Sequence, residues 1–289
     1  MFEAVSHPHL VSFDGKVEVS KLPTAPPGDV PKETKLEAEL TELTEKLDEL
    51  QRKLWAQDRW SVLFLFQALD AAGKDSTIRA VLSGVNPAGV HVASFKQPTH
   101  EELDHDFLWR STRKLPGRGT IGVFNRSYYE EVLVVRVHPE LLTAQRLPEV
   151  EAPDKVWKSR FRSIRQYEKH LARSGTVIVK FWLNVSPEEQ RQRFLARIDD
   201  QRKNWKFSEG DVEERQHFKE YLEAYEDVLR ETSKPWAPWY AIPADDKPYM
   251  RREVGRIMVA TLESLRPEYP RLGDLELDRL QKMRKKLES

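Results

Sequence analysis

The residues with the clearest chemical potential lie in the run Asp70-Ala71-Ala72-Gly73-Lys74-Asp75-Ser76-Thr77. A lysine after a turn of small residues, followed by hydroxyl side chains at the start of a helix, is typical of a phosphate-binding loop. In such a loop, backbone N–H groups surround an oligophosphate and the lysine neutralises bridging oxygens. We therefore expect Lys74 to be catalytic and the following residues to bind phosphate: Ala71, Ala72, Gly73, Asp75, Ser76 and Thr77.

This run departs from the standard phosphate-loop pattern at three positions. Ala68 stands where the pattern has its first glycine, and Asp75 occupies the position of the hydroxyl residue. Asp70 lies inside the loop, where a carboxylate repels phosphate unless a divalent cation lies between the two. We therefore expect Asp70 to be a catalytic residue and a ligand of Mg2+. The alternative is an ordinary strand-to-helix turn with a lysine on the surface.

A second group of polar side chains follows another apolar segment. Residues 120–124 are interpreted as a buried strand, and Asn125, Arg126 and Glu130 come after it. Parallel α/β sheets place catalytic groups at the carboxyl ends of their strands, so these three residues are candidate catalytic residues beside the phosphate loop. Alternatively, Asn125 and Arg126 merely cap and solvate a following helix.

The elements that must position these residues alternate along the chain. Five apolar segments are separated by helical patterns, and the phosphate loop follows the first segment. This order predicts an α/β protein with a three-layer, P-loop kinase-like fold, in which a parallel sheet of about five strands has helices on both faces. Prolines in the last segment place that strand at an edge. The predicted strands are 61–68, 90–95, 120–124, 176–183 and 236–242.

Capping patterns between these strands predict helices. Thr99 and Glu102 form a capping-box pattern that opens a helix to about residue 114. Ser186 followed by Pro187 is a second well-formed helix start. Further helices are expected over 153–173, 212–232 and 246–265.

The helix that begins at Pro153 is the most basic in the chain. Between Lys155 and Arg173 it carries seven lysines or arginines and one acid, Glu168. One-sided charge of this kind suggests a polyanion. We therefore predict a groove for a polyanionic chain along Lys158, Arg162 and Arg165. The alternative is a surface helix whose charge is balanced by acidic neighbours elsewhere in the fold.

A polar and basic segment at 199–211 lies between two predicted helices. Such a segment, late in a phosphate-loop fold, is typical of a lid that closes over phosphates and excludes water. We expect this lid at about 190–215. The residues predicted to cover the phosphates are Arg193, Arg197, Lys203 and Lys206.

The two ends of the chain differ from this pattern. Residues 1–31 are rich in proline and predict an extended strap along the domain surface. The next helix carries leucines at alternating steps of four and three residues, which fits packing on the parent domain or a dimer seam equally well. We divide the chain into an N-terminal extension (1–31), a catalytic domain (32–270) and a C-terminal helical tail (271–289).

The composition excludes several kinds of site. The 289 residues balance 47 lysines and arginines against 47 acids, so net charge argues neither for nor against a nucleic-acid partner. Without cysteine, the sequence cannot form a disulfide, a catalytic thiolate or a cysteine-bound zinc site. No apolar run reaches the length of a membrane span, and the first residues lack the pattern of a secretory signal. We expect a soluble, cytoplasmic protein.

Four segments, taken in order, resemble the second polyphosphate kinase family. The family's phosphate loop carries an aspartate where Asp70 stands, and the spacing of the segments fits from about residue 53 to residue 265. The resemblance covers most of the chain. The matching segments are 70–75, 125–130, 179–206, and 237–239 with 245–247.

This resemblance implies reversible phosphoryl transfer between inorganic polyphosphate and adenine nucleotides, with Mg2+ or alternatively Mn2+. Asn125 together with Glu130 resembles the class that phosphorylates both AMP and ADP, whereas an aspartate at position 125 is similar to the class acting mainly on diphosphates. The basic helix would then hold the polyphosphate chain. The resemblance also implies a homo-oligomer, a dimer or a tetramer, without a nucleic-acid or membrane partner.

Two other functions are compatible with parts of the sequence. An ATP-dependent nucleoside monophosphate kinase would share the fold but would make little use of polyphosphate. A non-catalytic scaffold that binds nucleotides or polyanions would use the basic helix and the leucine stripe, but it leaves Asp70 inside the loop without a purpose.

Overall fold

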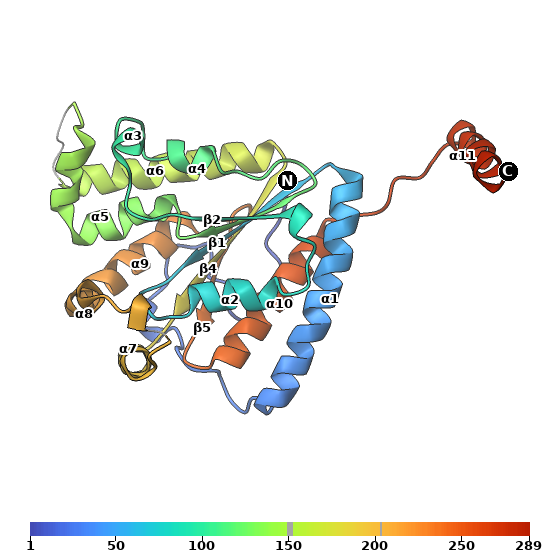
Figure 1. Ribbon diagram of the computed structural model, residues 1–289. Coiled ribbons are helices and arrows are strands. Elements are labelled where there is room, and N and C mark those ends of the chain that lie inside the picture. Colours follow the sequence, from blue (N-terminus) through green and yellow to red (C-terminus); the bar gives the residue numbers. More distant parts are fainter. Residues whose placement is uncertain (149–152, 203) are drawn as a thin grey trace.

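The structure is a computed structural model that describes residues 1–148, 153–202 and 204–289. Its centre is a sheet in the order β2-β3-β1-β4-β5, in which every neighbouring pair of strands is parallel. Helices cover both faces of the sheet (Figure 1). The predicted three-layer α/β architecture is therefore confirmed. The strands are β1 (Ser61–Gln67), β2 (Val90–Ser94), β3 (Ile121–Asn125), β4 (Thr176–Asn184) and β5 (Trp239–Pro243).

Helices form the connections between strands and flank the sheet at both ends of the chain. The α-helices are α1 (Glu33–Gln57), α2 (Lys74–Val81), α3 (His100–Leu103), α4 (Trp109–Thr112), α5 (Val134–Val137), α6 (Pro153–Arg173), α7 (Pro187–Asp199), α8 (Glu209–Glu214), α9 (Phe218–Thr232), α10 (Lys247–Ser264) and α11 (Asp274–Glu288). Short 3-10 helices are η1 (Val19–Lys21), η2 (Pro87–Gly89), η3 (Tyr128–Val132), η4 (Pro139–Gln145), η5 (Asn204–Lys206) and η6 (Arg215–His217).

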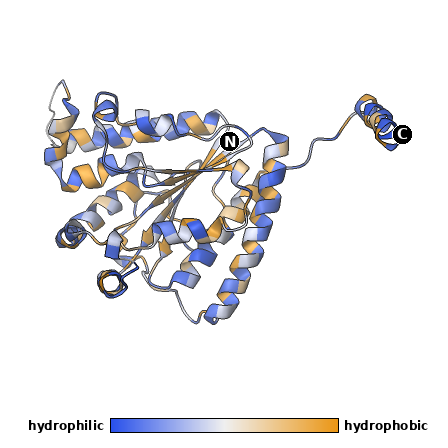
Figure 2. Cartoon of the chain, viewed as in Figure 1, coloured by the Kyte–Doolittle hydropathy of each residue, from blue (hydrophilic) through white to orange (hydrophobic). Residues whose placement is uncertain are grey.

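The central strands are mostly apolar because helices bury both of their faces. In β1, Val62, Phe64 and Phe66 pack in the cluster formed with α1, α2 and α10. Leu63 and Leu65 point to the opposite face, where α6 and α9 cover them. Figure 2 shows the strands as the hydrophobic centre between helices whose outer surfaces are hydrophilic. The sheet thus holds the carboxyl ends of β1 and β3 side by side.

Two of the predicted helices are interrupted. The capping box of Thr99 and Glu102 is present, but the helix that it opens has only four residues, and a separate short helix follows. Asp106 Oδ1 accepts a hydrogen bond from Leu108 N at 2.9 Å between the two helices, which replaces helical backbone bonding with a local turn. The helix expected over 212–232 is likewise divided into α8, η6 and α9.

Within residues 1–31, a short stretch around Leu10 pairs antiparallel with the outer side of β5, which is an edge strand of the sheet. Val11 N donates to Trp239 O, and Ala241 N donates to His9 O, both at 2.9 Å. These bonds satisfy backbone groups that an open sheet edge would expose. The first residues are therefore integrated into the packing of the domain.

The leucine stripe of α1 packs on α10 within the same domain. Leu36, Leu47 and Leu54 are at most 1% exposed. Gly255 of α10 permits this close approach, because a Cβ at that position would lie 3.3 Å from Leu40 Cδ1. Of the two uses expected for the stripe, the structure shows packing on the parent domain.

The last helix, α11, lies apart from the body at the end of an extended connection (Figure 1). All of its residues are exposed. Among the described residues, every helix is too short or too polar to span a lipid bilayer.

A polar network lies buried between β4 and the helices that cover it. Lys180 Nζ is 2.7 Å from Glu168 Oε2 and donates to Thr232 O at 2.9 Å. Glu168 Oε1 accepts hydrogen bonds from the hydroxyls of Tyr128 and Tyr129, at 2.9 and 2.7 Å. Burial lowers the pKa of Lys180 to about 8. The network connects β4 to α6, α9 and the segment directly after β3.

Replacing Lys180 with methionine should lower the free energy of unfolding by about 3–5 kcal/mol, because Glu168 stays buried without its partner. The double variant Lys180→Met/Glu168→Gln should recover part of that loss, since it leaves no unpaired charge. Urea unfolding at pH 7 measures both variants. A single variant as stable as the parent would show that the pair contributes nothing to stability.

Candidate active site

The phosphate loop joins the end of β1 to the start of α2. Gly73, the N-cap of α2, has a φ of 106°, in the left-handed region that glycine tolerates. A Cβ there would lie 3.3 Å from Met250 Cε and 3.4 Å from Ser76 Oγ. Ala71 is a second left-handed residue, with a φ of 62°. The loop therefore turns tightly enough to bring its backbone against a ligand at the N-terminus of α2.

Lys74 is folded against its own loop. Its Nζ donates to the carbonyl oxygens of Ala68 and Leu69, at 2.6 and 3.3 Å. Burial, together with repulsion from Arg126, lowers the pKa of Lys74 to about 8, against the attraction of Asp70. A buried ammonium bonded to neutral carbonyls can exchange those partners for phosphate oxygens, which would stabilise its charge more strongly.

Arg126 lies between two carboxylates at the carboxyl end of β3. Its guanidinium is 2.8 Å from Asp70 Oδ1 and 3.2 Å from Glu130 Oε2. Gln67 Nε2 donates to the other oxygen of Glu130 at 2.9 Å. Glu130, and then Asp70, raise the pKa of Arg126 despite its burial. Three of the predicted catalytic residues therefore form one connected group.

Asn125 connects β3 to the helix of the phosphate loop. Its Nδ2 donates to Asp75 Oδ1 at 2.7 Å. The alternative role of capping a helix falls to Ser127, whose hydroxyl accepts a hydrogen bond from Tyr129 N at 3.2 Å. The Asn125 side chain thus bonds to the helix of the phosphate loop, whereas that of the next residue, Arg126, bonds to Asp70 and Glu130.

A cavity of about 330 Å³ opens in front of this group; we call it the active-site cavity. Asp70, Arg126 and Glu130 form part of its wall, and residues of the segment predicted to be a lid form another part. Several apolar and aromatic side chains face the same space, so the cavity offers both charge and a hydrophobic surface to a ligand. Its lining is Ala68, Leu69, Asp70, Arg126, Glu130, Leu133, Val134, His138, Gln190, Ser208, Gly210, Asp211, Glu214, Arg215, Phe218, Tyr221 and Tyr225.

Two lining residues, Gln190 and Arg215, were not predicted from the sequence. They connect the segment predicted to be a lid to the phosphate loop. Gln190 Nε2 donates to Asp70 O at 3.0 Å. Arg215 Nε donates in turn to Gln190 Oε1 at 3.0 Å, and its guanidinium also donates to Pro187 O. Arg215 follows two glutamates, and its sequence context gives no signal of this role.

Arg193 lies beneath the phosphate loop rather than over the cavity. Its guanidinium donates to the carbonyls of Ala72 at 2.7 Å and Ala244 at 2.6 Å. Its Nε bonds to Glu189 at 2.7 Å. The sequence had suggested that Arg193 covers the transferred phosphate; with its donors used by these oxygens, it instead fixes the loop to the segment after β5.

The other predicted lid cations lie in different surroundings. Arg197 is 3.4 Å from Asp211 Oδ2, and burial raises the pKa of that aspartate. Asp211 lines the active-site cavity, whereas Arg197 does not. Lys203 and the side chain of Lys206 lie outside the described residues.

The three predicted groove residues of α6 do not line the active-site cavity. Lys158 and Arg162 are exposed, and Arg165 forms an ion pair with Glu231 of α9. The net charge counted along α6 is therefore reduced by an acid from another helix, as in the alternative interpretation. A polyphosphate groove along α6 stays a prediction.

The four sequence segments that suggested a family can now be compared with known proteins. The model of the family described as polyphosphate kinase 2 (PPK2) matches residues 31–270. The chain belongs to the polyphosphate kinase 2 family. The resemblance inferred from the motifs is thus confirmed.

Relatives within the polyphosphate kinase 2 family match most of the chain. The ADP-polyphosphate phosphotransferase of Rhodopseudomonas palustris is 55% identical over 244 residues, which cover 84% of each chain. The AMP/ADP-polyphosphate phosphotransferase of Meiothermus ruber is 48% identical over 239 residues, covering 83% of this chain and 85% of that one. A crystal structure of polyphosphate kinase 2 from Arthrobacter aurescens TC1 has a TM-score of 0.84 at 33% identity, covering 98% and 99% of the two chains. The predicted P-loop kinase-like fold is confirmed.

The donor set of this polyphosphate kinase 2 site fits a magnesium ion bound chiefly by its substrates. Among the described residues, no cluster of three or more acidic or histidine side chains could hold a metal ion. The Asp70 side chain is 29% exposed and lines the active-site cavity. Mg2+ is commonly bound through one or two carboxylates together with phosphate oxygens and water. Asp70 can supply the protein ligand of such an ion.

Replacing Arg193 with methionine should lower the free energy of unfolding by about 2 kcal/mol or more, because Ala72 O and Ala244 O lose a charged, buried donor. The Michaelis constant for the phosphate substrates should rise as well, since the loop is no longer fixed. Arg191→Met is the matched control, because Arg191 lies exposed on the same helix and pairs only at the surface with Glu188. Equal stability of the two variants would contradict the role assigned to Arg193.

The kcat/KM for the nucleotide should fall as pH rises above about 8, up to tenfold per pH unit. In the enzyme without substrate, Lys74 loses its proton in this range. The contribution of Lys74 to stability has the opposite pH dependence: its pKa is lower in the folded protein than its ordinary value of 10.5, so between about pH 8 and 10.5 the unfolded chain binds more protons and this contribution increases with pH. Circular dichroism over the same pH range shows whether the protein stays folded. Initial rates from pH 6 to 10 measure the profile. A flat profile would show that Lys74 keeps its proton.

Proposed function

We propose that this enzyme transfers phosphoryl groups reversibly between inorganic polyphosphate and adenine nucleotides, and that it accepts AMP as well as ADP. The observation that carries the proposal is the joined group of Asp70, Arg126 and Glu130 beside Lys74, facing a cavity of about 330 Å³. The names of the two relatives described above support polyphosphate as the donor and adenine nucleotides as acceptors.

The reaction requires alignment and charge neutralisation more than proton transfer. An oxygen of the nucleotide's terminal phosphate attacks the terminal phosphorus of polyphosphate. A new P–O bond forms while the bond to the next phosphate of the chain breaks, and the shortened polyphosphate leaves with that electron pair. The attacking phosphate is already ionised at neutral pH, so no side chain needs to act as a general base.

The residues of the site supply the positive charge that this transfer needs. Lys74 exchanges its carbonyl partners for phosphate oxygens at the loop. Arg126, held from both sides by Asp70 and Glu130, is placed to stabilise charge on the transferred group. A Mg2+ ion held by Asp70 and the phosphates, or Mn2+ in its place, would neutralise further charge.

The choice of acceptor rests on Asn125 and Glu130. The names of the two relatives differ in the acceptor, since one specifies ADP and the other AMP/ADP. The neutral amide of Asn125 bonds to Asp75, whereas an aspartate would place two like charges together beside the phosphate loop. Less negative charge at this point lowers the repulsion of the phosphates of either nucleotide, and the acceptance of AMP beside ADP rests on the resemblance of Asn125 and Glu130 to the class that phosphorylates both. We extend the proposal to a cytoplasmic homo-oligomer, a dimer or tetramer, on the family resemblance alone.

The test mixes the purified protein with Mg2+, long-chain polyphosphate and AMP in the absence of ATP. Chromatography should detect ADP first and ATP afterwards, because each product of the first transfer is an acceptor for the second. Conversion of ADP with AMP left untouched would refute the proposed use of AMP and leave polyphosphate as the donor. If nothing reacts until ATP is added with a monophosphate, the protein is an ATP-dependent nucleotide kinase.

The matched variants for this assay are two aspartate-to-asparagine changes. Asp70→Asn should lower the rate by about 100-fold or more, because the site loses both its metal ligand and a partner of Arg126. Asp278→Asn changes the same charge on the exposed helix α11 and should leave the rate unchanged. Normal turnover by Asp70→Asn would contradict the proposed mechanism.

A further inference from the structure

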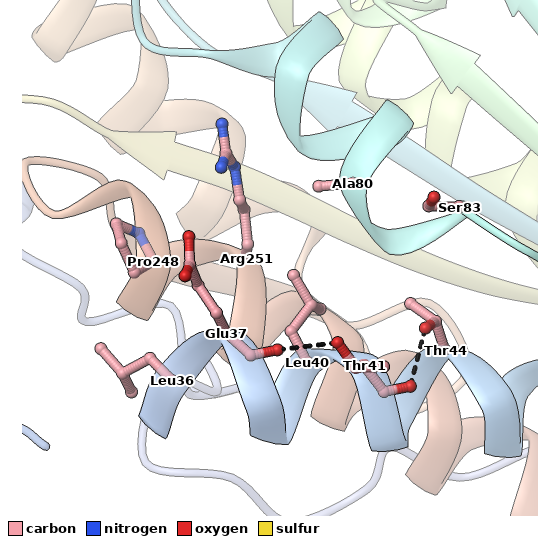
Figure 3. A pocket seen from close by; sticks show the side chains of 9 residues that line it. All are labelled: Leu36, Glu37, Leu40, Thr41, Thr44, Ala80, Ser83, Pro248 and Arg251. Carbon is pink, nitrogen blue, oxygen red and sulfur yellow. Dashed lines mark hydrogen bonds between the residues drawn. The ribbon is translucent and has the colours of Figure 1, made fainter. Parts of the chain in front are cut away.

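A second cavity, of about 310 Å³, lies between α1, α2 and α10 (Figure 3); we call it the helix cavity. It shares no lining residue with the active-site cavity. Its wall combines apolar side chains with hydroxyl, carboxylate and guanidinium groups. The lining residues are Leu36, Glu37, Leu40, Thr41, Thr44, Ala80, Ser83, Pro248 and Arg251.

Arg251 is the unsatisfied group in this cavity. Its Nε is buried and has no hydrogen-bond partner among the described residues. Figure 3 shows the side chain extending from α10 into the space in front of α2, with the guanidinium at its far end. A buried N–H group without an acceptor is unfavourable, and a charged one more so. This Nε is covered by protein atoms, so a ligand in the cavity would bind the terminal nitrogens of the guanidinium and compensate the charge of the whole group.

The charges around Arg251 leave it with too little anionic compensation. After burial, the nearby Arg79 is the next cause that lowers the pKa of Arg251, and Arg193 acts in the same direction. Glu37 and Glu33 attract it, but no ion pair joins either of them to Arg251. An added anion would compensate this excess of positive charge.

The other polar groups of the helix cavity do not replace such a ligand. Thr41 Oγ1 donates to Glu37 O at 3.0 Å, and Thr44 Oγ1 donates to Thr41 O at 2.8 Å (Figure 3). Both hydroxyls thus use their hydrogens within α1. The guanidinium fork of Arg251 is the group in this wall that matches the oxygens of a phosphate or carboxylate.

We propose that the helix cavity is a second binding site, separate from the active site, for a small molecule that carries an oxyanion. The oxyanion binds the guanidinium of Arg251, and the rest of the ligand lies against the partly exposed Leu40. The volume exceeds that of a single phosphate and suits a short polyphosphate or a nucleotide. Both present the same terminal phosphate to the arginine.

A ligand in the helix cavity would contact the helix that carries Lys74. Ala80, in the last turn of α2, and Ser83, just after the helix ends, line the cavity. Met250, the neighbour of Arg251, contacts the start of the same helix, with its Sδ 3.8 Å from Thr77 Oγ1. Binding would therefore bridge α10 and α2 and stabilise the helix behind the phosphate loop.

The test measures thermal unfolding of the full chain with inorganic phosphate, tripolyphosphate or AMP. A Lys74→Ala background weakens binding at the phosphate loop, so that the response of the helix cavity can be isolated. At about 100 times the Kd, the ligand should raise Tm by about 5 °C. Adding Arg251→Met should abolish this rise, whereas adding Arg256→Met should retain it. Arg256 is the matched control because it lies exposed on the same helix and pairs with Glu253.

The stability of Arg251→Met and the anion affinity of Glu37→Gln test the proposal further. Without ligand, Arg251→Met should unfold at the same temperature as the parent or above it, because it removes an unpaired buried donor. Glu37→Gln should bind the anion several-fold more tightly, because it removes a competing negative charge from the wall. A response to tripolyphosphate but not AMP, or the reverse, identifies the source of the oxyanion. The proposal would be overturned if ligand raised the Tm of the Arg251 and Arg256 variants equally. It would also be overturned if no ligand raised the Tm of the Lys74→Ala protein.

Discussion

The position of Arg126 between Asp70 and Glu130 is the interaction on which the site depends. A site for polyanions must gather positive charge before its ligand arrives, and each cation then needs a partner in the protein. Two carboxylates hold Arg126, and two carbonyl oxygens hold Lys74. The carboxylate partners keep Arg126 fixed, whereas the neutral partners leave Lys74 free to exchange them for phosphate. Burial, and then repulsion from Arg126, lowers the pKa of Lys74 to about 8.

The fold supplies this arrangement through the parallel register of β1 and β3. Phe66 pairs with Asn125, so the chain leaves both strands at the same level of the sheet. Arg126 has a φ of 64°, in a region that arginine seldom adopts, and such a residue persists only where its surroundings determine it. Tyr128 and Tyr129, which follow Arg126 after one residue, donate hydrogen bonds to Glu168. The buried network thus secures the turn that orients Arg126.

The parts predicted correctly from sequence are those encoded by neighbouring residues. Apolar runs specify the strands, and the small residues before Lys74 specify the loop. The basic helix was harder to interpret because counting charges along α6 ignores Glu231, which approaches from α9 and pairs with Arg165. Arg193 likewise looks like any lid arginine until the fold brings Ala72 and Ala244 to it. Roles set by contacts between distant segments have no local signal.

Arg193 and Arg251 show how differently two arginines near the same loop can be used. Arg193 donates to carbonyl oxygens of two segments, and these hydrogen bonds hold the loop in place. Arg251 lies on the neighbouring helix with a buried Nε that has no acceptor among the described residues. A packed domain generally satisfies such donors, since leaving one unpaired lowers stability. An oxyanion bound in the adjacent helix cavity would supply the charge compensation that Arg251 lacks, whereas Arg193 already has its acceptors.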